Sequence, residues 1–148
     1  MSLKLTRRLA VNDDISIDDE LILDYLQREK GRFRAFTNKG VEVNVFLQRG
    51  RTLVIGEILQ SACGQNIAIT GALEEVAIAQ TDDWEKFSRA CYHLGNRHVK
   101  VEIGDCWLRL KPDHVLEDLL VLIGLKLSHE KSVFVPESGA YAHVHQHQ

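Results

Sequence analysis

All seven histidines of this chain lie after residue 92, and three of them alternate with other residues near its end: His143, His145 and His147. At neutral pH, an uncharged imidazole ring binds transition metals such as nickel, copper and zinc. The uneven distribution predicts one module without metal and a second module that handles metal. The alternating His-x-His-x-His run favours metal binding over a tail that merely happens to be polar.

Two other histidines occupy positions from which a ring could reach an ion. We expect His98 at the start of a strand, on the same polar face as Glu102. We expect His114 at the first position of a helix, where a neutral ring is more favourable than a charged one. His93 is expected to be exposed near the end of another helix, and His129 is assigned no role.

A single protomer offers too few fixed ligands for a tight, buried metal site. A closed zinc site uses four protein ligands and a catalytic site uses three, and the chain has no His-Glu-x-x-His motif and no paired cysteines. A symmetric dimer places each residue twice about its axis. If His98 lies on that axis, two rings converge in a shallow, exchangeable site, which suits a carrier better than an enzyme.

The composition is that of an ordinary, slightly acidic globular protein. The 148 residues carry a net charge of −3, with 45% hydrophobic and 26% charged residues, which allows one ordinary domain or two small ones. No basic block is present, so nucleic-acid binding is not expected. We expect neither a secretory signal nor a membrane span, which needs about 18 apolar residues. Three cysteines without a CxxC pair predict a reduced, cytoplasmic protein: Cys63, Cys91 and Cys106.

Residues 1–72 show the pattern of a small all-β domain. Short alternating or apolar segments are separated by breaks that contain glycine, and residues 38–40 are expected to form a hairpin turn. Strands this short and closely spaced predict a sandwich or barrel-like module. The expected strand segments are residues 21–25, 32–36, 42–46, 54–55, 58–59 and 67–69.

From residue 73 to residue 136 the pattern changes to strands alternating with helices. Strands are expected at residues 75–79, 98–103, 106–110 and 132–135. A first helix is expected to begin after the acidic segment 81–83, to end at a left-handed Gly95, and to bury Trp84, Phe87, Cys91 and Leu94. A second helix is expected after Asp113, burying Val115, Leu116, Leu119, Leu122 and Ile123.

The predicted fold class is therefore α+β, with two domains and a tail. The order βαββαβ in residues 73–136 is that of the ferredoxin-like fold. Residues 137–148 lack a core-forming pattern and are expected to form a mobile tail that contains three histidines.

Several segments of the chain resemble the UreE family of urease accessory proteins, which are nickel metallochaperones. The most specific is the Leu-Gly-Asn-Arg-His run that ends at His98, followed by Asp-His-Val-Leu at residues 113–116. Residues 31–37, 39–40 and 46–50 resemble the family's N-terminal domain, and residues 136–141 resemble its lead-in to a tail that bears histidines. The resemblance covers nearly the whole chain.

This resemblance implies a homodimer that binds Ni²⁺, with Zn²⁺ or Cu²⁺ as other ions that can bind. His98 would be the central ligand at the dimer interface, and His114 would belong to a peripheral site, weakened here because Pro112 stands where some members carry a histidine. The N-terminal domain would face partner proteins, the ferredoxin-like domain would dimerise, and the tail histidines would add ligands. The implied partners are the urease apoprotein and its accessory proteins, including the GTPase.

Two other functions remain open from the residues alone. A metal-dependent hydrolase would use His98 with Glu102 as the base, although a third fixed ligand and a nucleophile motif are missing. A protein-interaction module without metal would make the histidines incidental. The carrier is favoured over both, so the chain is not expected to be an enzyme.

Overall fold

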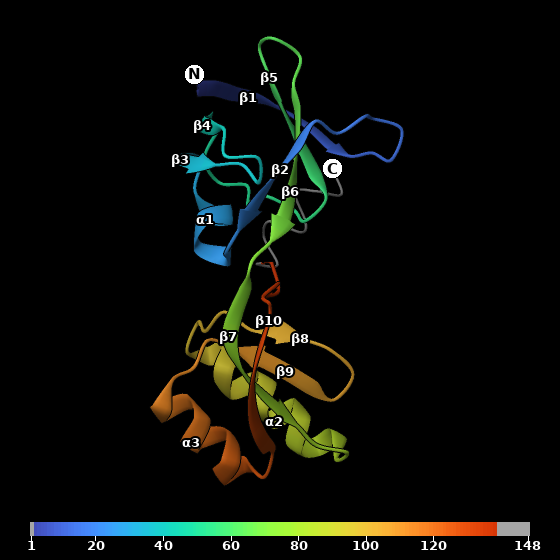
Figure 1. Ribbon diagram of the computed structural model, residues 1–148. Coiled ribbons are helices and arrows are strands. Elements are labelled where there is room, and N and C mark those ends of the chain that lie inside the picture. Colours follow the sequence, from blue (N-terminus) through green and yellow to red (C-terminus); the bar gives the residue numbers. More distant parts are fainter. Residues whose placement is uncertain (1, 139–148) are drawn as a thin grey trace. The chain divides into compact units, whose positions relative to one another are not determined.

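The structure is a computed structural model that describes residues 2–138 (Figure 1). The chain divides into two compact units, Met1–Ala72 and Leu73–Gln148. Both contain strands and at least one helix, so the expected α+β class with two domains is confirmed. Among the described residues, no helix has the length and apolar character needed to cross a membrane.

The N-terminal unit is a six-stranded mixed sheet in the order β2-β6-β5-β1-β4-β3. The β1–β4 and β2–β6 pairs are parallel and the other neighbours are antiparallel. Alternate residues of these strands point inward and form one apolar core. The strands are β1 (Ser2–Val11), β2 (Asp19–Leu23), β3 (Arg32–Phe36), β4 (Glu42–Phe46), β5 (Glu57–Ser61) and β6 (Asn66–Gly71).

Most of the expected strands of this unit are present, and the β3–β4 hairpin closes at Gly40, which has a φ of 83°. The all-β description was wrong at one place, because α1 (Tyr25–Glu29) follows β2. This helix is too short to show a period, but Asp24 and Gln27 form a capping box that marks its start. Residues 54–55 lie in a loop rather than a strand.

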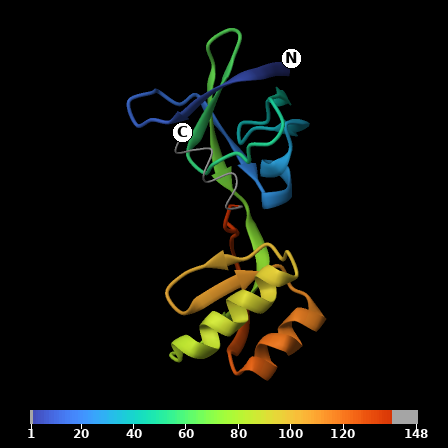
Figure 2. The same cartoon turned by 180° about the vertical axis from the view of Figure 1, so that it is seen from behind.

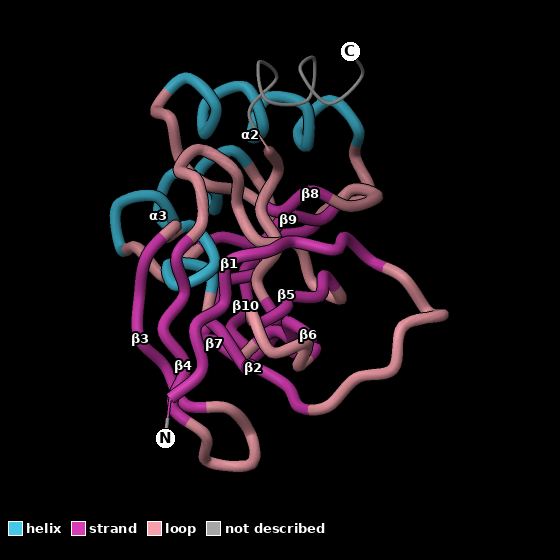
Figure 3. Tube along the Cα trace, turned by 90° about the horizontal axis from the view of Figure 1, so that it is seen from above, coloured by secondary structure: helices cyan, strands magenta, loops and turns pink. Residues whose placement is uncertain are grey.

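The C-terminal unit has the element order βαββαβ. Its sheet has the strand order β10-β7-β9-β8, and all neighbours are antiparallel. Both helices lie side by side on one face of this sheet, as Figures 1, 2 and 3 show from three directions. The elements are β7 (Leu73–Gln80), α2 (Trp84–Asn96), β8 (Glu102–Ile103), β9 (Trp107–Leu110), α3 (His114–Ile123) and β10 (Lys126–Val133).

Small residues on the central strand allow the helices to approach the sheet. Ala77 and Ala79 of β7 are fully buried, and the register places them opposite Leu110 and Leu108 of β9. The α2 residues that pack against this layer are Phe87, Ala90 and Leu94, and α3 adds Leu120. Burial of such apolar surface, at about 25 cal/mol per Å², is the main stabilising term for this unit.

Three residues expected to be inward-facing are exposed instead. Trp84 at the start of α2 is 68% exposed, and Val115 and Leu122 of α3 are 72% and 84% exposed. The α3 sequence is apolar at most positions, so its period does not select one face. The helix turns Leu116, Leu120 and Ile123 toward the core.

Two strand boundaries also differ from those expected. Of residues 98–103, only Glu102 and Ile103 pair as a strand. The last strand begins at Lys126 and ends at Val133, because all eight of its residues pair with β7.

Gly104→Ala should destabilise the C-terminal unit. An added Cβ would lie 2.0 Å from Cε2 of Trp107, so the β8–β9 hairpin must shift, at a cost of about 1–3 kcal/mol. Urea denaturation would measure the change in the free energy of unfolding. Gly95→Ala is the matched control, because nothing lies within 4 Å of its added Cβ and alanine favours a helix interior by about 1 kcal/mol. Equal stability of the two variants would contradict this packing.

Candidate metal centre

His98 lies at the C-terminal end of α2, in a turn rather than in a strand. Its backbone N–H donates to the Gly95 carbonyl oxygen at 3.0 Å, and the Val99 N–H donates to the Leu94 carbonyl oxygen at 3.2 Å. These two bonds form the Schellman motif that ends many helices, and they put His98 at the position after the C-cap, Arg97. The expected place of His98 on a polar strand face was therefore wrong.

The left-handed residue of this motif is His98, with a φ of 57°, and not Gly95. Gly95 lies inside the helix, which continues to Asn96. Glycine is usual at the left-handed position, because a side chain there costs roughly 1–2 kcal/mol. Ala10 and Cys106 have similar left-handed φ angles, 61° and 58°, so the backbone angle alone does not assign a function to the His98 side chain.

The His98 side chain borders an open pocket of about 300 Å³. Cys91 and Gly95, two turns and one turn earlier, line the same pocket. Burial raises the pKa of the Cys91 thiol, and the neighbouring Cys106 raises it further. At neutral pH, Cys91 is therefore an uncharged thiol, which leaves the exposed imidazole of His98 as the better metal ligand in this pocket.

Glu102 does not share a strand face with His98, and it has other partners. One of its carboxylate oxygens, Oε2, lies 3.0 Å from Nη1 of Arg109, and Oε1 accepts the Val135 N–H at 3.0 Å. A carboxylate held by a guanidinium and a backbone donor is a poor general base. The hydrolase hypothesis required Glu102 to act as a base beside His98, and the structure does not support that arrangement.

His114 is the first residue of α3, as expected, and its side chain is 90% exposed. Its Nε2 lies 3.5 Å from Oδ2 of Asp118, one helical turn later. The N-cap is Asp113, whose Oδ1 accepts the Leu116 N–H at 3.1 Å. His114 is therefore accessible to an ion, with one carboxylate beside it.

The two remaining histidines of the described chain differ from expectation. His93 is half-buried rather than exposed, with its ring edge-on to Tyr92 at 5.3 Å between centroids. His129 is not isolated, because its Nε2 lies 2.5 Å from Oε1 of Glu117. The sequence analysis missed this pair, since Glu117 and His129 come from different elements, α3 and β10, and share no local motif.

Within residues 2–138, no group of three or more His, Cys, Asp or Glu side chains is arranged to hold a metal ion. The candidate ligands His98 and His114 therefore do not form one complete site within the described part of a single chain. The other candidates, His143, His145 and His147, lie outside the described residues.

His98→Gly should stabilise the apo protein. Glycine removes the cost of a side chain in the left-handed region, so the free energy of unfolding should rise by about 1 kcal/mol. The matched variant His98→Ala removes the same imidazole but keeps a Cβ, and it should show no such gain. Denaturation without metal would compare the two; an alanine variant as stable as the glycine variant would show that the turn is not strained.

Known proteins are similar to this chain along nearly all of its sequence. The family model described as UreE urease accessory protein, N-terminal domain, matches residues 4–72, and the C-terminal domain model matches residues 74–148. A urease accessory protein UreE from Marinomonas sp. is 50% identical over 145 residues, covering 98% of this chain and 99% of the relative. UreE proteins from Alteromonas mediterranea (50% identity, 85% of this chain, 82% of the relative) and Psychromonas ingrahamii (44%, 98% and 97%) are also similar. This chain belongs to the UreE family of urease accessory proteins.

Proposed function

We propose that this protein is a metallochaperone that binds Ni²⁺ through histidines at a homodimer interface and delivers it during assembly of the urease active site. The observation that carries the proposal is His98, an exposed imidazole held in a left-handed turn at the rim of an open pocket. The turn fixes the backbone of His98, and the pocket leaves its ring accessible. Fixed and accessible ligands suit an ion that must be bound and then released.

The proposed ligand set needs two chains. Each chain contributes one His98, and a twofold axis beside this residue brings the two rings together. We classify the βαββαβ unit, with its strand order β10-β7-β9-β8, as the ferredoxin-like domain that forms this dimer. The histidines at 143, 145 and 147 would add ligands by tethering, and His114 would form a weaker peripheral site.

Imidazole ligands do not by themselves select nickel. Nickel(II) stands high in the divalent affinity order, but copper(II) stands above it and zinc(II) is comparable. The same site should therefore also bind Cu²⁺ and Zn²⁺. In this proposal, selectivity comes from metal availability and from the partner proteins.

We further propose that the protein works in the cytoplasm and hands its ion to other proteins. The N-terminal unit would contact the urease apoprotein or its accessory proteins, including the GTPase. No catalytic role is assigned, because the Glu102 carboxylate is held by Arg109 and is not beside His98.

Nickel titration of the purified protein tests the shared site. We expect about half an ion per chain at micromolar affinity or tighter, because two His98 rings share each ion. In His98→Ala this tight binding should be lost while light scattering still reports a dimer. The control is His114→Ala, which should keep the tight ion. One tight ion per chain, or no loss in His98→Ala, would exclude the shared His98 site.

Metal affinity should fall between pH 7.5 and pH 5.5. A metal binds only the unprotonated imidazole nitrogen, so protons compete with the ion as the pH decreases. Calorimetric titrations at the two pH values, with circular dichroism to confirm folding, would measure the difference. Equal affinities at both values would be incompatible with histidine ligands.

One observation favours a different function, that of a protein-interaction module without metal. The exposed apolar residues of α3, Val115 and Leu122, are what an interaction module without metal would present to a partner. Absence of nickel binding below about tens of micromolar would favour this module over the carrier.

A further inference from the structure

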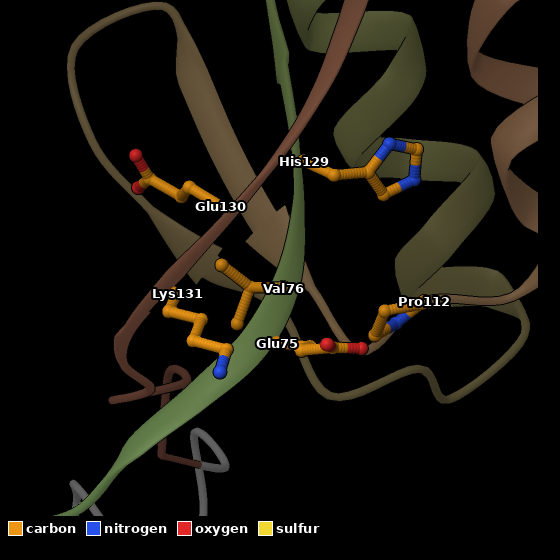
Figure 4. A pocket seen from close by; sticks show the side chains of 6 residues that line it. All are labelled: Glu75, Val76, Pro112, His129, Glu130 and Lys131. Carbon is orange, nitrogen blue, oxygen red and sulfur yellow. The ribbon is translucent and has the colours of Figure 1, made fainter.

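Two parts of the surface outside the His98 pocket gather charged side chains. The first is a pocket of about 330 Å³ over β7 and β10, shown in Figure 4. Within residues 2–138, no hydrogen bond or ion pair joins its His129 to its Glu75, so these side chains do not form one binding unit. The second is the outer face of β1, β4 and β3 in the N-terminal unit, where contacts between side chains join neighbouring strands.

The strand register brings cations from β1 and β3 onto one face of the sheet. The two strands flank β4 (Figure 1). Lys4 of β1 is paired with Asn44 of β4, and Asn44 is paired with Arg34 of β3. Directly paired residues point to the same face of a sheet. The residues on either side of Asn44, Val43 and Val45, are fully buried in the core, so the cations lie on the outer face.

Two aromatic rings lie among these cations. Phe46 of β4 is 42% exposed and Phe36 of β3 is 63% exposed. Nζ of Lys4 lies 5.0 Å from the centroid of the Phe46 ring, and Cζ of Arg32 lies 6.0 Å from it. Cation–π attraction at these distances holds both cations beside the ring. The outer face therefore presents positioned cations next to exposed aromatic surface.

Positive charge dominates this face, although the chain as a whole has a net charge of −3. The side chains of Lys4, Arg32 and Arg34 are exposed. Glu42 is the only acidic residue in the three strands. Its Oε1 lies 4.0 Å from Nη1 of Arg34, and an ion pair between such accessible groups is weak. The three cations therefore remain available to carboxylates from another molecule.

We propose that the outer face of β1, β4 and β3 docks an acidic segment of a partner protein. Carboxylates of this segment pair with Lys4, Arg32 and Arg34, and an apolar side chain between them covers Phe36. Arginine beside exposed aromatic surface is the composition of a protein-binding hot spot, and a guanidinium group binds a carboxylate through two parallel hydrogen bonds. The inference rests on the proposed function in one respect, that the N-terminal unit contacts partner proteins, and it does not depend on nickel or His98.

A protein segment fits this face better than the phosphate backbone of a nucleic acid. Glu42 lies among the cations and would repel a run of phosphates, and the acidic chain as a whole opposes their approach. A peptide can place its carboxylates beside the cations and leave the position near Glu42 apolar or polar.

Selection from a mixture of random peptides tests the proposal. The peptides are mixed in solution with the full-length protein and a metal chelator, and those that co-elute with the protein in gel filtration are identified by mass spectrometry. We expect enrichment of peptides that carry two or more Asp or Glu residues beside Leu, Ile or Phe. The double variant Arg32→Ser, Arg34→Ser should lose this enrichment. No preference for acidic over basic peptides, or the same preference in the double variant, would overturn the proposal.

Single variants locate the binding surface. In anisotropy titrations with a selected peptide, Arg34→Ser and Phe36→Ser should each weaken binding about fivefold or more. Arg51→Ser, at an exposed cation between β4 and β5, is the matched control and should leave the affinity unchanged. Urea denaturation would verify that each variant is folded. An equal loss in Arg51→Ser, or tighter binding of a single-stranded oligonucleotide than of the peptide, would contradict an acidic protein partner.

The same variants separate this docking surface from the proposed nickel site. Arg34→Ser should bind nickel like the unmodified protein, and His98→Ala should bind the selected peptide with unchanged affinity. Loss of peptide binding in His98→Ala would show that the peptide docks on the C-terminal unit and would overturn the proposal. A protein that fails to bind nickel but selects acidic peptides through β1, β4 and β3 would refute the carrier function alone.

Discussion

The left-handed backbone at His98 is the constraint on which the candidate metal centre depends. The two hydrogen bonds to Leu94 and Gly95 end α2 and reverse the chain toward β8. Leu94 and Val101, on either side of the turn, are buried in the same core cluster. The turn is thus anchored by apolar packing while the His98 ring remains outside the core. A side chain on a rigid turn needs little reorganisation when an ion arrives.

The carboxylates of the C-terminal unit divide into those with partners and those without. Glu102 is held by Arg109 and by a backbone N–H, and Glu117 is held by His129 and by another backbone N–H. Glu102 therefore stabilises the sheet through its contact with Arg109, and Glu117 orients the His129 imidazole. Glu75 is exposed and has no such contact within residues 2–138. The contacts of Glu102 argue only against its use as a base beside His98.

The proposed carrier function is compatible with the separation of the two candidate ligands in the described part of the chain. His98 and His114 lie at opposite ends of different helices, one after the end of α2 and one at the start of α3. A protein that kept its metal would gather three or four ligands in one chain. In the proposed carrier, ligands that combine only across a dimer would hold an ion less firmly and could pass it on.

Local signals in the sequence determined the elements with strong periodicity or clear caps. The β3–β4 hairpin, the N-cap Asp113, a helix start after residues 81–83 and the order βαββαβ followed from alternation, turn residues and capping chemistry. The strand β1 was missed, because its pairing with β5 has two register shifts that interrupt alternation. The segment Leu-Gly-Asn-Arg-His and the similarity over the whole chain were enough to indicate the UreE family.

Only the tertiary structure decided the environment of each candidate ligand. The sequence placed Gly95 at the left-handed position, but burial of Leu94 and Val99 against the core extends α2 and moves that position to His98. It also could not pair His129 with Glu117, since a strand and a helix meet there only after the sheet has formed. The sequence alone identifies the residue types that can bind metal. Their orientation, accessibility and partners arise from packing between elements that are distant along the chain.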